Sequence, residues 1–69
     1  MKLSARNQFP GIVSSVKKGP TSTSVKVEVA PGLHITSIVT TEAATELKLK
    51  KGSKVTAIIK APSVILGVE

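Results

Sequence analysis

The 69-residue chain contains no cysteine, tryptophan or tyrosine, and Phe9 is its only aromatic residue. The absence of cysteine excludes disulfides and thiolate zinc sites, which often support very small domains. One histidine, no aspartate and four glutamates are too few ligands to enclose a metal ion. A domain of this size buries only about 60% of the surface that its unfolded chain exposes, so its core is marginal. The sequence therefore predicts a homo-oligomer, in which copies of the chain support one another.

Long apolar runs are also missing. The longest, residues 57–59 and 64–68, fall far short of the roughly 20 residues that a membrane-spanning helix needs. The N-terminus lacks the apolar core of a secretory signal, so we expect a cytoplasmic protein. An enzyme is not expected, because His34 has no aspartate or cysteine with which to form a hydrolytic triad or a thiol nucleophile.

Valine, isoleucine and threonine make up nearly a third of the chain, and these β-branched residues favour strands over helices. The clearest strand is residues 23–29, where valines alternate with polar residues. Turn residues occur at 17–20 and 30–33, and Pro10 is expected to begin the first strand or to mark a bulge. Five strands are predicted, at residues 11–16, 23–29, 34–40, 54–60 and 64–68.

A short helix is predicted between the third and fourth strands. Thr40, Thr41 and Glu42 suit its N-terminus, since a hydroxyl caps free N–H groups and an acid complements the helix dipole. Gly52 suits its end. Three strands, one helix and two strands is the order of the OB-fold. The predicted fold class is therefore all-β, an OB-like five-stranded Greek-key barrel that forms a single domain over residues 1–69.

Both faces of the last two predicted strands carry apolar side chains. In a closed small barrel only one face meets the core. Ile58 and Ile65 point to the other face, and we interpret them as contacts with another subunit. The alternative is that they are isolated surface aliphatic residues, which are common on proteins.

Ten lysines and arginines against four glutamates give a formal charge of +6. A basic OB-like barrel suggests nucleic-acid binding, because cations that neutralise phosphates release counterions. Single-strand binders of this fold stack bases on aromatic side chains, however, and Phe9 alone is no such platform. Nucleic-acid binding therefore stands as the alternative function, and an assembly module without a ligand as a third. Solvated charge is expected for the lysines at predicted turns and the helix end: Lys17, Lys18, Lys48, Lys50 and Lys51.

Two segments are rich in hydrogen-bond donors and contain no acid. Residues 4–8 read Ser-Ala-Arg-Asn-Gln, and residues 60–63 read Lys-Ala-Pro-Ser. Charged groups, hydroxyls and backbone N–H groups that arrive together recognise a tetrahedral oxyanion. Arg6 or Lys60 taken singly is also compatible with a solvated surface charge. The pair of segments is nevertheless a candidate oxyanion site.

These two segments, with Thr-Ser-Ile-Val-Thr at 36–40 and Ala-Ile-Ile-Lys-Ala at 57–61, resemble the molbindins over nearly the whole chain. Molbindins are small cytoplasmic molybdate-binding proteins made of one Mop domain, also described as a TOBE domain. The resemblance implies a hexamer of three dimers that stores molybdate or tungstate between its subunits, with no cofactor, membrane or nucleic-acid partner. By position, it assigns the oxyanion shell to Ser4, Ala5 and Arg6 of one subunit and to Lys60, Ala61 and Ser63 of a neighbouring subunit, completed by Thr40.

The chemistry of such a shell agrees with this ligand. Molybdate is a dianion at neutral pH, so all of its oxygens accept hydrogen bonds, whereas phosphate often keeps a proton that needs an acceptor. A shell made only of donors therefore favours molybdate over phosphate. Sulfate is also a dianion, and only the size of the cavity separates it from molybdate and tungstate. A ligand that prefers the oligomer also stabilises it by mass action.

Overall fold

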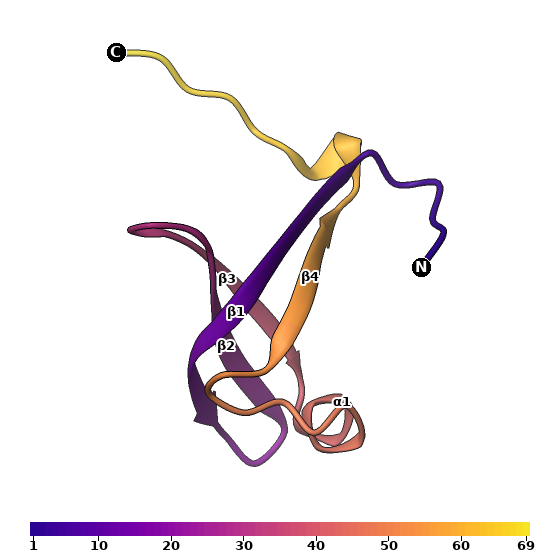
Figure 1. Ribbon diagram of the computed structural model, residues 1–69, viewed down its shortest axis with the longest axis vertical. Helices are drawn as coiled ribbons and strands as arrows, with labels where there is room; N and C mark the ends of the chain where they lie inside the picture. The colour runs from indigo at the N-terminus through magenta and orange to yellow at the C-terminus, as the bar shows by residue number, and fades with distance from the viewer.

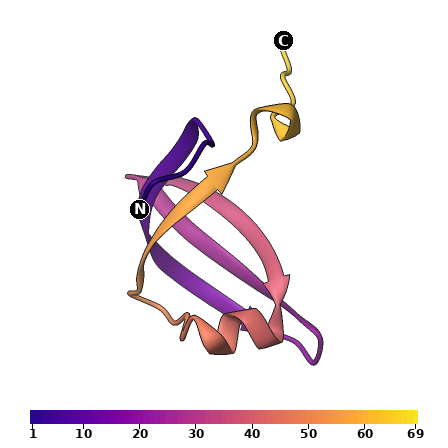
Figure 2. The same cartoon turned by 90° about the vertical axis from the view of Figure 1, so that its right-hand side faces the viewer.

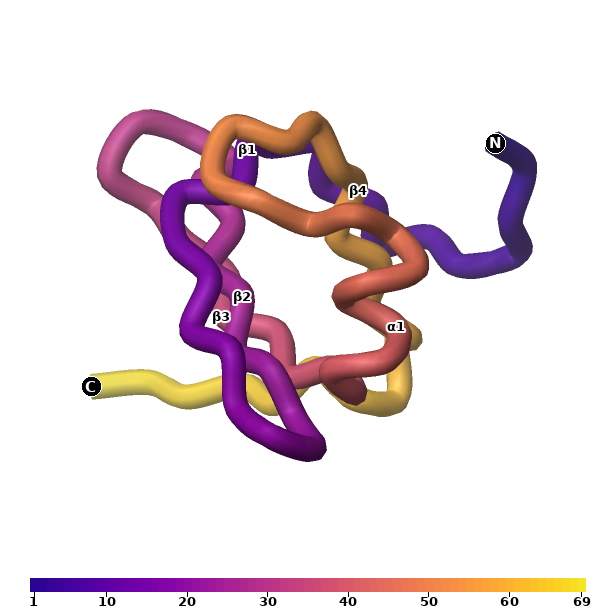
Figure 3. The backbone as a smooth tube through the Cα atoms, turned by 90° about the horizontal axis from the view of Figure 1, so that it is seen from below, coloured from indigo at the N-terminus to yellow at the C-terminus, as the bar shows by residue number.

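A computed structural model describes all residues, 1–69, as a curled four-stranded antiparallel sheet with one short helix (Figures 1 and 3). The strands lie side by side in the order β3-β2-β1-β4. Along the chain the elements are β1 (Asn7–Lys18), β2 (Ser22–Ala30), β3 (Leu33–Thr40), α1 (Thr41–Glu46), β4 (Lys54–Ile59) and the 3-10 turn η1 (Ala61–Ser63). The all-β class, with a short helix between the third and fourth strands, is therefore confirmed.

Strands β1, β2 and β3 form two successive antiparallel hairpins, as the turn residues predict. The β1–β2 turn is closed by a hydrogen bond from the Gly19 N–H to the Ser22 carbonyl, at 3.0 Å. In the turn between β2 and β3, Gly32 takes a left-handed backbone conformation with φ 76°. Glycine adopts this conformation without a Cβ clash, so the sequence and the turn agree here.

Strand β1 is longer than predicted, because its first half pairs with β4 and its second half with β2. Pro10 lies inside the first half, and the register shifts between Val13 and Ser15, so the prediction that Pro10 begins the strand or forms a bulge is wrong. The Val13 N–H donates to the Ser53 carbonyl, on the β4 side, at 2.9 Å. Successive residues of a strand direct their backbone polar groups to alternate sides, so the Pro10 nitrogen faces β2 and not β4. The β1–β2 ladder begins only at Ile12, so β2 does not pair with Pro10. Proline is tolerated there because no ladder bond is lost.

The core is small and lies on the inner face of the sheet. The alternating valines of β2 face it as predicted: Val25 and Val27 are buried together with Val13 of β1. Ala44 of α1 is buried as well, but only five of the 69 residues reach this state. So small a buried set agrees with the expectation that the chain's own core is marginal.

The start of α1 is tied to the β1–β2 turn by threonines. The Thr40 hydroxyl accepts from the Ala43 N–H at 3.0 Å, so the predicted N-cap is confirmed. The Thr41 hydroxyl donates to the Gly19 carbonyl at 2.7 Å. Its proton is thereby used, so the buried Thr23 hydroxyl is the donor in the 2.8 Å bond between Thr23 and Thr41. No buried side-chain polar atom in the chain lacks a partner.

The end of α1 differs from the prediction. Residue Lys48, with φ 54°, closes the helix in the left-handed conformation. Its N–H donates to the Thr45 carbonyl at 3.1 Å, and the Leu49 N–H donates to the Ala44 carbonyl at 3.0 Å. These two bonds form a Schellman motif, which satisfies the last carbonyls of the helix. Gly52, expected to end the helix, instead lies in the turn before β4 with φ 94°.

The predicted fifth strand, residues 64–68, is wrong for the single chain. Residues 64–69 form no ladder and extend away from the sheet after η1 (Figures 1 and 2). The side chains of Ile65, Leu66 and Val68 are 93%, 88% and 99% exposed. The alternating pattern predicts a strand, but a strand needs a partner edge, and this segment reaches none in its own chain. The closed five-stranded Greek-key barrel is therefore also wrong, because the curled sheet has four strands and stays open between β3 and β4.

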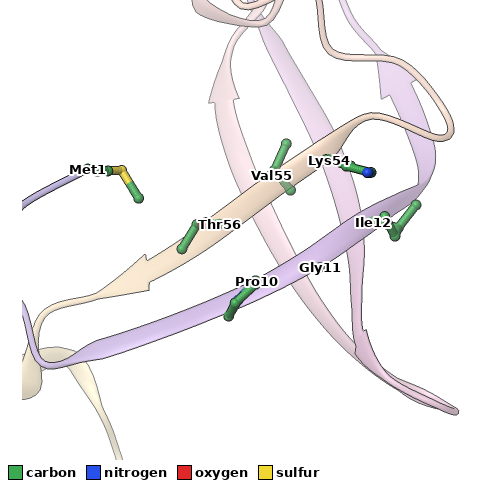
Figure 4. A pocket seen from close by; sticks show the side chains of 7 residues that line it. All are labelled: Met1, Pro10, Gly11, Ile12, Lys54, Val55 and Thr56. Carbon is green, nitrogen blue, oxygen red and sulfur yellow. The ribbon is translucent and has the colours of Figure 1, made fainter.

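Gly11 allows close packing in the middle of β1, beside β4 (Figure 4). A Cβ at this position would lie 2.5 Å from the Glu28 carbonyl oxygen and 2.8 Å from Cγ1 of Val27. Because the first of these atoms belongs to paired backbone, Gly11→Ala is expected to destabilise the fold by about 1–3 kcal/mol. Thermal denaturation should then show a melting temperature lowered by at least about 4 °C. Ser15→Ala, at an exposed position of the same strand, serves as the control, and equal melting temperatures for the two variants would contradict this account.

Candidate functional site

The two donor-rich segments meet at one end of the sheet. The last pair of the β1–β4 ladder is Asn7↔Ile59, so residues 4–6 lead into this end and residues 60–63 lead out of it. Figure 1 shows the start of β1, the end of β4 and η1 together at the top of the molecule. Two segments more than fifty positions apart in the sequence are thus brought to one place by a single ladder.

The charged donors at this end are free. Arg6 and Lys60 are exposed, and neither side chain donates a hydrogen bond within the chain. The Ser4 hydroxyl is also exposed and unbonded. The Ala5 carbonyl accepts from Nε2 of Gln8 at 2.7 Å, and this bond folds the segment just before β1. The guanidinium, the ammonium and the hydroxyl are therefore each available to an acceptor outside the chain.

The turn η1 arranges the second segment. Lys60 has an extended backbone, and Pro62 stands inside the turn that follows. The Ser63 N–H donates to the Lys60 carbonyl at 2.9 Å, and the Val64 N–H donates to the Ala61 carbonyl at 3.2 Å. The Ala61 N–H has no partner in this turn. The Ala61 N–H and the Ser63 hydroxyl are therefore available in the turn that follows Lys60, and both are donors that an oxyanion shell requires.

Thr40 is not brought to this end within one chain. It stands at the junction of β3 and α1, at the opposite end of the sheet from η1 (Figures 1 and 2). Its hydroxyl accepts from the Ala43 N–H, which leaves the hydroxyl proton free for another acceptor. Of the seven predicted site residues, six therefore belong to the two segments at this end of the sheet, and Thr40 lies at the other end.

An apolar groove of about 710 Å³ runs along the inside of the sheet, between β3 and β4. Its lining is mostly aliphatic, with Ser63 at one end. Leu47 and Leu49 contribute from the loop after α1 and Ile35 from β3. The sequence prediction missed this groove because it filled the space with the fifth strand. The available signal was the pair of leucines at 47 and 49, two apolar positions in an otherwise lysine-rich stretch.

Three other depressions on the molecule do not combine an arginine, a lysine and an unbonded hydroxyl. A shallow depression beside β1 and β4 is lined by Lys54 as its only lysine or arginine (Figure 4). His34, Glu42 and Glu46 are exposed. No group of three or more histidine, cysteine, aspartate or glutamate side chains lies in a position to hold a metal ion. None of the helices is long and apolar enough to cross a membrane.

Comparison with known proteins gives a consistent result. The TOBE domain model matches residues 3–66. The chain is 44% identical over 69 residues to a probable molybdenum-pterin-binding protein of Haemophilus influenzae, and the match covers all of both chains. It is 47% identical over 66 residues to the molybdenum transport protein ModE of Herbaspirillum seropedicae, which is 96% of this chain but only 24% of that protein.

Two solved structures share the fold along the whole chain. MopII from Clostridium pasteurianum superposes with a TM-score of 0.91 at 39% identity, covering 97% of this chain and 100% of that one. A molybdate-binding protein from Sporomusa ovata superposes with a TM-score of 0.90 at 28% identity, covering 99% of this chain and 100% of that one. The open four-stranded sheet and its extended tail are thus close to the chain fold of these two proteins.

Proposed function

Since the chain belongs to the TOBE domain family and, within it, to the molbindins, we propose that it binds molybdate at sites formed between copies of itself. Tungstate is the second expected ligand, because it is an oxyanion of the same charge and similar size. The role is storage of the oxyanion in the cytoplasm by a single Mop domain over residues 1–69. Neither catalysis nor a resident cofactor is part of this function, and the metal enters only as its oxyanion.

The observation that carries the proposal is the free donor set at the end of the β1–β4 ladder. Arg6 and Lys60 supply charge, and the hydroxyls with the Ala61 N–H complete a shell without any acid. A dianion with four accepting oxygens satisfies such a shell, whereas a protonated phosphate would leave its own O–H without an acceptor. The proposed shell consists of Ser4, Ala5, Arg6, Thr40, Lys60, Ala61 and Ser63.

Two features support a site that two copies share. Thr40 lies at the far end of the sheet from Arg6 and Lys60, so it joins them only if it comes from another chain. All of these donors are also exposed in the single chain, and an exposed pair of charges is screened by water and binds an anion weakly. A second copy that covers the shell would exclude water and strengthen each hydrogen bond.

The C-terminal segment supports the same assembly. Residues 64–68 are apolar and exposed, and the groove between β3 and β4 is apolar and lacks a strand. We therefore propose that residues 64–68 of one copy complete the sheet of another, which also covers Ile58 and Ile65, both exposed in the single chain. Three such dimers would form the expected hexamer. Because η1 joins the shell to this segment, anion binding and assembly involve the same turn.

Calorimetric titration and native mass spectrometry of the whole protein test this function together. We expect heat of binding at about 10–100 µM molybdate or below, and a hexamer mass that increases by whole molybdate ions. Sulfate is the matched control, since it has the same charge and a smaller radius, and it should bind more weakly. The proposal would be contradicted if the oligomer is intact but molybdate produces no heat of binding in the titration and no increase in its mass.

A further inference from the structure

The end of the sheet opposite Arg6 and Lys60 carries a positive depression that is separate from the one lined by Thr40. It has a volume of about 300 Å³, and its cations are Lys18, at the end of β1, with Lys48 and Lys50, from the loop after α1. No acidic residue lines it. Glu46, although close in sequence, lines a different depression. Three lysines thus line one hollow that has no acidic residue in its lining.

Lys48 is held there at a conformational cost. It occupies the left-handed position that closes the Schellman motif of α1, with φ 54°. Glycine normally takes this position, because a Cβ makes the left-handed conformation unfavourable. Backbone strain of this kind is concentrated at functional sites. Lys48 occupies this position although glycine would fit it without strain, and Lys18 and Lys50 line the same depression. A bound anion that neutralises the three charges would stabilise this arrangement.

The lining of the depression limits the kind of anion. The Thr45 hydroxyl donates to the Thr41 carbonyl at 2.9 Å, and the Thr23 hydroxyl donates to Thr41, so neither is free to donate to a ligand. The charged lysines are therefore the side-chain donors that remain. A single tetrahedral dianion would neutralise only two of the three. Phe9 is not among the lining residues, so nucleic-acid bases have no aromatic surface on which to stack.

We propose that the depression bordered by Lys18, Lys48 and Lys50 is a second anion site, which binds small polyphosphate-type anions that carry about three negative charges. Within one chain it is distinct from Arg6 and Lys60, which lie at the other end of β1, and Thr40, the shell residue at this end, lines a different depression. The site does not depend on molybdate binding. Its ligand is recognised by charge, and binding should therefore weaken as the salt concentration rises.

Titration with inorganic pyrophosphate tests this site, with molybdate present throughout at a saturating concentration. Lys48→Gly is expected to weaken pyrophosphate binding about fivefold. The same variant should raise the melting temperature by about 2–6 °C, because glycine relieves the left-handed strain. Lys18→Gln should weaken binding to a similar degree without this gain in stability. The control is Lys26→Gln, which removes one charge from the exposed face of β2, away from the depression.

Several outcomes would overturn the proposal. One is equal pyrophosphate affinity for Lys48→Gly and Lys26→Gln, which would mean that only net charge matters. A second is pyrophosphate binding that appears only in a titration from which molybdate is omitted, which would place both anions in one site. A third is tight binding of a short single-stranded oligonucleotide with no binding of pyrophosphate, since the surface would then serve a nucleic-acid backbone. Because each titration reads pyrophosphate alone, a failure to bind molybdate would not imitate any of these results.

Discussion

A chain that ends at Ser63 is expected to be monomeric and to bind molybdate about a hundredfold more weakly than the whole protein. The deleted residues 64–69 include none of the proposed donors, but they include the Val64 N–H that bonds the Ala61 carbonyl, so the oligomer mass is the measure of the lost partner copy. The expected effect is large because burial of each exposed aliphatic side chain in this segment contributes about 1.5–3 kcal/mol. Without that contribution, a small interface has little else to overcome the entropy of association.

Native mass spectrometry and titration calorimetry measure the two effects on the same sample. Deletion of Glu69 alone is the matched control, because it shortens the chain and leaves the apolar residues in place. The core valines of β1 and β2 lie outside the deleted segment, so circular dichroism should report a retained sheet. A truncated chain that keeps its oligomer mass would refute the role assigned to residues 64–68.

Substitution of the charged donors gives the second large effect. Arg6→Ala and Lys60→Ala are each expected to weaken molybdate binding by about ten- to a hundredfold, since each removes a charged hydrogen-bond donor from a covered shell. Their melting temperatures should stay close to that of the parent without ligand, because both side chains are exposed and unbonded in the single chain. Lys2→Ala, another exposed cation near the N-terminus, is the control.

Mixing the two variants tests whether one site draws on two copies. If Arg6 and Lys60 of a site come from different chains, a dimer of one Arg6→Ala copy and one Lys60→Ala copy has one site with both donors and one site with neither. Half of the sites would then recover the parent affinity. If both donors come from the same chain, every site lacks one donor and the mixture binds no more tightly than either variant. This result would mean that Arg6 and Lys60 of one site do not come from two different copies.

Much of the fold follows from local patterns. The alternation of Val25 and Val27 in β2 predicts a half-buried strand, and Gly32 predicts the turn behind it, because both depend on a few neighbouring residues. The Thr40 cap was predictable for the same reason. The end of the helix was not predictable in this way. Lys48 takes the left-handed position that glycine usually occupies, and this position depends on the hydrogen bonds that Lys48 and Leu49 donate back to the helix.

The sequence by itself determined the strand-rich class, the hairpin order, the small core, and the two donor-rich segments, because residue type and spacing dictate these features. Only the tertiary structure decided that the β1–β4 ladder brings these segments to one end, that Thr40 lies at the other, and that residues 64–68 find no strand partner in their own chain. The physical reason is that an alternating pattern records which side chains seek burial. It does not record which edge, in which chain, provides the hydrogen bonds.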